Sequence, residues 1–136
     1  MIVVDTNIVA YALIQGEKTQ LAHLAIRKDA QWRLPPLWRY EMLNVLAVYV
    51  QHRGCSLAQA LELWEEAVRR FESCERNISL SQALQIAAKY RMSAYDAQFI
   101  ALALSLGVRC LTEDRLLLNT FPGVAVSLRE FCQAQE

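Results

Sequence analysis

The opening seven residues, MIVVDTN, constrain the fold more than any other stretch of this chain. A short apolar run rich in β-branched residues is followed at once by Asp5, Thr6 and Asn7. This pattern is typical of a buried parallel strand that carries an acidic side chain to the carboxyl edge of a sheet. In open α/β sheets, ligands bind at that edge. The question is therefore which later residues meet Asp5 there.

After this opening strand, segments whose apolar residues repeat with a helical period alternate with short apolar segments typical of strands. The predicted helices cover residues 7–15, 18–30, 37–53, 57–73, 81–90 and 93–106 and begin again near residue 128, and the predicted strands cover residues 2–4, 32–34, 76–80, 108–112 and 124–126. Such alternation predicts an α/β fold. We expect a three-layer α/β/α sandwich whose central parallel sheet has four to five strands with doubly wound, Rossmann-like connections.

Length and composition limit the class of protein. The 136 residues fit one domain, residues 1–136, and a hydrophobic fraction of 54% is enough for one core. The charge-free runs reach about a dozen residues, fewer than the roughly 20 of a membrane-spanning helix, and the first residues do not have the pattern of a secretory signal. The four cysteines form no CxxC pair, which argues against a zinc site. We expect a cytoplasmic protein that does not bind membranes.

Acidic residues stand alone in several apolar stretches. Asp5 is the only acid in residues 1–16, Glu41 the only one in residues 30–61, and Asp96 the only one in residues 76–112. An isolated buried carboxylate costs several kcal/mol unless it is paired, protonated or bound to a metal. Asp114 follows the predicted strand 108–112 and so reaches the same sheet edge as Asp5. The pattern predicts four carboxylates at one site.

Each acid also has a structural alternative that the sequence leaves open. These are helix capping by Asp5, an ion pair of Glu41 with Arg33 or Arg39, a capping box of Ser93 with Asp96, and an ordinary turn at Asp114. A shared site explains all four acids together, because the elements that carry them converge on one edge of a small sheet.

Electrostatics indicates what such a cluster binds. Two carboxylates about 5 Å apart repel by about 3 kcal/mol at an effective dielectric constant of about 20. No lysine or arginine lies in residues 1–17 or in the predicted helix that carries Asp96. A site made of oxygen ligands without Cys or His selects Mg²⁺ or Mn²⁺, ions that bind phosphate oxygens as further ligands. The implied reaction is phosphodiester hydrolysis.

Four segments of the sequence, taken in order, resemble a known family. They are VVDTN, WRYEMLNVL with Glu41, SAYDAQFIALA with Asp96, and CLTEDRLL with Thr112 and Asp114. Together they resemble the PIN-domain nucleases, specifically the VapC-like toxins of type II toxin–antitoxin systems. The resemblance spans almost the whole chain and includes the order and spacing of the four acids.

The resemblance implies a PIN-like fold and an Mg²⁺-dependent endoribonuclease, usually a homodimer, that a cognate antitoxin inhibits by occupying the active-site groove. By analogy the four acids hold one or two Mg²⁺ ions, while Thr112 and either Thr6 or Asn7 orient the carboxylates. Some relatives carry a further acid shortly after the last one, and residues 115–119 contain none here. We therefore expect one firmly bound ion.

The remaining charge and the aromatic residues suggest how RNA is held. Without the four proposed site acids, the chain carries a formal charge of +4, which suits a polyanion. Arg39, Arg91 and Arg115 lie close in sequence to site residues and are candidates for phosphate contacts. Tyr40 and Tyr95 are able to stack on bases, although we interpret them as core residues.

Two other functions compete with this interpretation. One is a catalytically silent module of the same fold that binds RNA or a protein. Another is an aspartyl-phosphate phosphatase of the haloacid dehalogenase type, whose DxD opening is broken here by Asn7. A dinucleotide-dependent oxidoreductase is excluded, since the four glycines are far apart and form no phosphate-binding loop.

Overall fold

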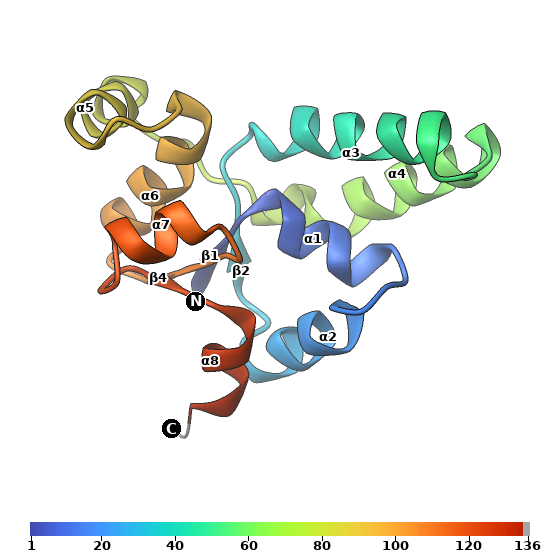
Figure 1. Ribbon diagram of the computed structural model, residues 1–136, viewed down its shortest axis with the longest axis horizontal. Helices are drawn as coiled ribbons and strands as arrows, with labels where there is room; N and C mark the ends of the chain where they lie inside the picture. Colours follow the sequence, from blue (N-terminus) through green and yellow to red (C-terminus); the bar gives the residue numbers. More distant parts are fainter. Residues whose placement is uncertain (135–136) are drawn as a thin grey trace.

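The computed structural model describes residues 1–134, which form a four-stranded sheet surrounded by helices (Figure 1). Along the chain the elements are β1 (Ile2–Val4), α1 (Thr6–Leu13), α2 (Thr19–Lys28), β2 (Trp32–Arg33), α3 (Trp38–His52), α4 (Leu57–Phe71), the 3₁₀ turn η1 (Glu72–Cys74), α5 (Leu80–Tyr90), α6 (Ala94–Leu106), β3 (Cys110–Leu111), α7 (Arg115–Thr120), β4 (Ala125–Val126) and α8 (Leu128–Gln133). None of these helices has the length and apolar run that a membrane crossing requires.

The sheet is parallel throughout, and the first strand is central in it. The strand order is β2-β1-β3-β4, with Val3 paired to Arg33 on one side and to Cys110 on the other. The backbone N–H of Asp5 donates to the Leu111 carbonyl at 3.1 Å, so the residue after β1 is held against the end of β3. The predicted parallel α/β sheet is confirmed, and β1 delivers Asp5 to the middle of its carboxyl edge.

Residues 76–80 do not form the fifth strand that their sequence suggested. The pairing is limited to one parallel bridge between Leu34 and Glu75, supported by a bond from the Arg76 N–H to the Leu34 carbonyl at 2.9 Å. Ser79 then caps α5 by accepting from the N–H of Gln82 at 3.2 Å, which turns the chain into a helix. Helix capping therefore ends the extended segment before a strand can develop.

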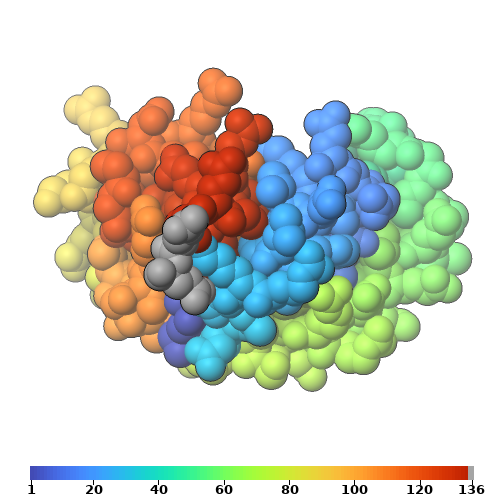
Figure 2. Space-filling view, turned by 90° about the horizontal axis from the view of Figure 1, so that it is seen from below, coloured from blue at the N-terminus to red at the C-terminus, as the bar shows by residue number. Residues whose placement is uncertain are grey.

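Helices cover both faces of the sheet and complete three layers. Helix α6 packs on β1 and β3, and α5 packs on α6. Helices α1 and α2 pack together, and Figure 1 shows the sheet between these two helical groups. The C-terminal helix α8 lies against α2, as Figure 2 shows, where Lys28 Nζ donates to the Phe131 carbonyl at 2.6 Å. Helices α3 and α4 pack side by side and extend away from the sheet.

Aromatic side chains join the α3–α4 pair to the edge of the sheet. The Phe71 ring stacks on Trp32 of β2 at a centroid distance of 5.8 Å and meets the edge of Trp38 of α3 at 6.2 Å. All three side chains are buried. This contact positions the first turn of α3, which carries Glu41.

Helix α7 was missed from the sequence, where TED was interpreted only as a turn. Asp114 is the residue before this helix, and its Oδ1 accepts from the Leu117 N–H at 3.2 Å. The leucines of this helix at residues 116–118 form an unbroken apolar run, in which no helical period appears.

Replacing Phe71 by Ala should destabilise the protein strongly. The substitution removes a 5% exposed ring and leaves a cavity against two tryptophans, which costs about 3 to 5 kcal/mol of unfolding free energy in urea titrations. Leu57→Ala, on the same helix and 64% exposed, is the matched control and should cost less than about 1 kcal/mol. Equal losses in the two variants would contradict this account of the α3–α4 attachment.

Candidate active site

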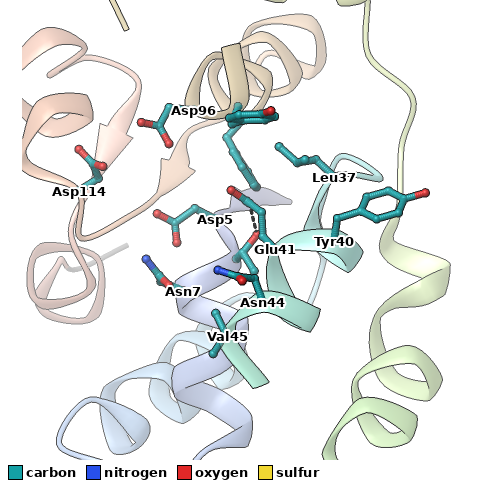
Figure 3. A pocket seen from close by; sticks show the side chains of 12 residues that line it. Asp5, Asn7, Leu37, Tyr40, Glu41, Asn44, Val45, Asp96 and Asp114 are labelled. Atoms are coloured by element: carbon teal, nitrogen blue, oxygen red, sulfur yellow. Dashed lines mark hydrogen bonds between the residues drawn. The ribbon is translucent and has the colours of Figure 1, made fainter. Parts of the chain in front are cut away.

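The four acids line one pocket of about 590 Å³ at the carboxyl edge of the sheet (Figure 3). Asp5 follows β1, Glu41 and Asp96 lie in the first turns of α3 and α6, and Asp114 precedes α7. The structure therefore brings together residues that are spread over more than a hundred positions of the sequence. Within residues 1–134, no lysine or arginine side chain lines the pocket.

Asp5 is the most constrained of these acids. Its side chain is 8% exposed, and Oδ1 accepts from the Ile8 N–H at 3.2 Å, so the residue caps α1. Its Oδ2 accepts from the Thr112 hydroxyl. The capping alternative is thus correct for Asp5, and capping and pocket placement are compatible because the two oxygens have different partners.

Two threonine hydroxyls donate hydrogen bonds to the carboxylates of the pocket. The buried Thr112 hydroxyl donates to Asp5 and accepts from the Asp114 N–H at 3.0 Å, so it connects two strand ends. Thr6 donates to Glu41 Oε1 at 2.6 Å. Asn7 is exposed and lines the pocket beside these groups. Of Thr6 and Asn7, between which the sequence left the choice open, Thr6 is the one whose hydroxyl bonds to one of the four carboxylates.

The ion pair considered for Glu41 does not form. Arg39 instead pairs with Glu75 through its Nε and lies 3.9 Å from Glu72. The Trp38 indole N–H also donates to Glu75, at 2.7 Å. Successive helical residues point in different directions, so Arg39 faces the 3₁₀ turn while Glu41 faces α1.

Asp96 and Asp114 both lie at helix starts. Ser93 caps α6 by accepting from the Asp96 N–H at 3.0 Å, and within the described residues the reciprocal bond of a capping box is not formed there, although α4 has one between Ser56 and Gln59. The Asp96 carboxylate is therefore available to the pocket. Asp114 is the N-cap of α7 rather than a residue of an ordinary turn, and it also lines the pocket.

Burial and repulsion between carboxylates raise the pKa of Asp5, Glu41 and Asp96. Burial raises the pKa of Asp5 to about 6, and the charges of Glu41 and Asp114 add to this, against the hydrogen bonds from Thr112 and Ile8 that lower it. Burial also raises the pKa of Glu41 and of Asp96, with the neighbouring carboxylates adding to the effect. A bound cation would stabilise the charged carboxylates and so offset both their burial and their repulsion.

The donor atoms of the pocket suit a hard divalent cation, but their spacing limits how many of them can bind one ion. All side chains that line the acidic part of the pocket offer oxygen or amide donors, as Mg²⁺ and Mn²⁺ prefer. In residues 1–134 no three His, Cys, Asp or Glu side chains are close enough to hold one ion together, so the four do not converge as tightly as the sequence suggested. Unneutralised carboxylates repel one another, which favours this spacing. Mg²⁺ needs only one or two carboxylates and retains water as its other ligands.

The residues proposed to contact RNA are arranged differently from the sequence expectation. Arg91 and Arg115 are exposed but do not line the pocket, and Arg39 has acidic partners. The interpretation of Tyr40 and Tyr95 as core residues is wrong, because they are 69% and 63% exposed and line the pocket. Each precedes an acid on its helix, which turns its ring outward.

Four residues that line the pocket were not identified from the sequence, namely Leu37, Asn44, Val45 and Phe99. Asn44 follows Glu41 by three positions on α3, and Phe99 follows Asp96 by three positions on α6. Residues three apart share a helix face, so the acids and a helical period were the signal that could have found these two.

Comparisons with known proteins identify the family to which this fold belongs. The family model described as PIN domain matches residues 2–120, so the chain belongs to the PIN-domain family. It is similar to Ribonuclease VapC3 from Pyrobaculum aerophilum, with 27% identity over 126 residues that cover 90% of this chain and 96% of that protein. It also resembles the crystal structure of PAE2754 from Pyrobaculum aerophilum, with a TM-score of 0.76, 20% identity, and coverage of 96% of this chain and 85% of that one.

The raised pKa of Asp5 predicts how stability changes with pH. Below a pH of about 6 the folded protein binds a proton at Asp5 that the unfolded chain does not bind until its pKa of 3.8, so unfolding free energy rises as the pH falls through this range. Relative to Asp5→Asn, the wild type should gain up to about 3 kcal/mol between pH about 7.5 and about 4 in urea titrations without metal. The same pH dependence in both proteins would contradict the raised pKa.

Proposed function

We propose that this chain is an Mg²⁺-dependent endoribonuclease that hydrolyses RNA phosphodiester bonds and acts as a toxin neutralised by a cognate antitoxin. The observation that carries the proposal is the set of four acids, supplied by four separate elements, around one pocket without a lysine or arginine. A binding module has no need for four carboxylates at the place where a polyanion would bind, since each repels phosphate. The similarity to a protein named Ribonuclease VapC3 supports the same activity.

Each polar residue of the pocket has a proposed task. Asp5, Glu41, Asp96 and Asp114 would hold Mg²⁺ or Mn²⁺ together, with one or two of them binding the ion directly and the others through its water ligands. The bound ion supplies Lewis-acid stabilisation of the charge on the scissile phosphate.

Threonine hydroxyls prepare these carboxylates for the ion. The hydroxyl of Thr112 holds Asp5, and the hydroxyl of Thr6 holds Glu41. These bonds fix the direction of the carboxylates before substrate arrives, which reduces the cost of ordering them during the reaction. Asn7 offers an amide to the open side of the pocket.

The proposed partners follow from the open, acidic pocket and from the exposed apolar surface. A basic segment of an antitoxin would cover the pocket and neutralise its carboxylates. A second copy of the chain would cover apolar side chains such as Leu80 and Leu84, which are 70% and 64% exposed on α5. We place the action of this single domain, residues 1–136, in the cytoplasm with its RNA substrate. Exposed Arg91 and Arg115 remain candidates for phosphate contacts outside the pocket.

Removal of one carboxylate should abolish RNA cleavage. Asp5→Asn and Asp96→Asn should each lower kcat at least about 100-fold in a gel assay with labelled RNA and Mg²⁺, because the ion contributes several kcal/mol to stabilising the transition state. Asp29→Asn is the matched control, since Asp29 is the only aspartate outside the pocket and pairs with the N-terminal amine at 2.7 Å. Chelation of the metal by EDTA should reduce the wild type to the level of the variants.

Two results would contradict the proposal. Equal cleavage by wild type, Asp5→Asn and Asp96→Asn would remove the acids from the mechanism. No cleavage by the wild type, together with no Mg²⁺ uptake in calorimetry, would favour the catalytically silent binding module instead.

A further inference from the structure

The pocket has an aromatic and apolar side in addition to its acidic side. Its lining includes Leu37, Tyr40, Val45, Tyr95 and Phe99 beside the acids. Figure 3 shows Tyr40 at the end of the pocket opposite Asp114, with Glu41 between them. A ligand that fills the pocket therefore meets both carboxylates and apolar or aromatic groups.

Helices α3 and α6 contribute to both sides of the pocket in the same way. Each presents a tyrosine immediately before an acid in its first turn, Tyr40 before Glu41 and Tyr95 before Asp96. Neighbouring helical residues point about 100° apart, so the acid and the tyrosine face different parts of the pocket. Both acids are half-buried, whereas the tyrosines are 69% and 63% exposed at its rim.

Contacts within the protein do not account for the placement of Tyr40 and Tyr95 at the rim of the pocket. Within residues 1–134, neither ring packs on another aromatic ring and neither hydroxyl forms a hydrogen bond to protein. By contrast, Tyr90 meets the edge of Phe121 at 4.6 Å, and Tyr11 lies under Lys18 at 5.3 Å. Exposed tyrosine rings beside a pocket offer contact area at a small entropic cost, because the side chain has few rotatable bonds.

Building on the proposed nuclease function, we propose that Tyr40 and Tyr95 are substrate-positioning residues that stack on unpaired bases beside the scissile phosphate. In the proposed enzyme the bound Mg²⁺ would attract the scissile phosphate, but within residues 1–134 no lysine or arginine lines the pocket to hold the neighbouring nucleotides, so a contact that does not depend on charge would add affinity there. Stacking on an aromatic ring provides one, and every base has a face that can stack.

This geometry favours an unpaired strand over a duplex. A base in a helix is already stacked on its neighbours, and it must leave the helix before it can lie on a tyrosine. Stacking also tolerates any base, so the tyrosines would set the position of the phosphate and the single-stranded character of the substrate rather than a particular sequence.

The test compares cleavage of a short single-stranded RNA with Mg²⁺ by wild type, Tyr40→Ala, Tyr95→Ala and the matching Phe variants. Each Ala variant should lose about 5- to 150-fold in kcat/KM, mainly through a higher KM, which is the range that base stacking produces. The Phe variants keep the ring and should stay within about twofold of wild type. Leu61→Ala, 53% exposed on α4 and outside the pocket, is the control and should keep wild-type activity.

A substrate that lacks one base next to the cleaved bond separates stacking from a structural effect. The missing base should cost the wild type as much as the tyrosine substitution does, and it should cost the corresponding Ala variant little more. A 2-aminopurine base at the same position should be quenched on binding to the wild type and not to that variant.

Several outcomes overturn the inference while the proposed nuclease function stands. These are wild-type kcat/KM in both Ala variants, equal losses in the Phe and Ala variants, or an abasic penalty that is the same in wild type and variants. Inactivity of the wild type on every RNA would instead overturn the proposed nuclease function and the inference with it. A matching thermal unfolding midpoint, within about 2 °C, confirms that the Ala variants are folded.

Discussion

The constraint on which the rest of the structure depends is that carboxylates which repel one another are held at one edge of a small sheet. The parallel pairing of β1 with β3 sets the residues after the two strands side by side, Asp5 near Asp114. Helices α3 and α6 then start at the same edge and bring Glu41 and Asp96 to it. Backbone hydrogen bonds and core packing hold this arrangement against the repulsion, because the acids themselves supply no attraction.

The hydroxyls around the acids relieve only part of this cost. Thr112 stabilises the charge of Asp5, yet burial outweighs it and the pKa of Asp5 still rises to about 6. The same carboxylate caps α1 through its other oxygen, so a structural task and a chemical one share a side chain. Functional sites often bury ionisable groups at a cost in the stability of the fold, because the chemistry needs their charge. A cation bound among these acids would therefore offset the cost of burial and the repulsion between them.

Helices α3 and α6 each carry a half-buried acid and an exposed tyrosine at neighbouring positions of the first turn. Glu41 and Asp96 face the buried part of the pocket, and the tyrosines before them face its rim. The acids suit a metal and a phosphate, whereas the aromatic side chains suit a base. This combination explains how a pocket without lysine or arginine can bind a strand that carries a negative charge at every phosphate.

The sequence by itself predicted the parallel sheet and a set of acids at its carboxyl edge, because strand and helix periods and isolated carboxylates are local signals. It did not reveal α7, whose leucines at residues 116–118 form an unbroken apolar run without a helical period, and it predicted a strand at residues 76–80 where capping by Ser79 begins a helix. Only the tertiary structure decided that Glu41 bonds to Thr6, which is 35 positions away, and that the tyrosines are exposed. The physical reason is that a residue's partners and exposure depend on how distant elements pack, and local sequence does not encode that packing.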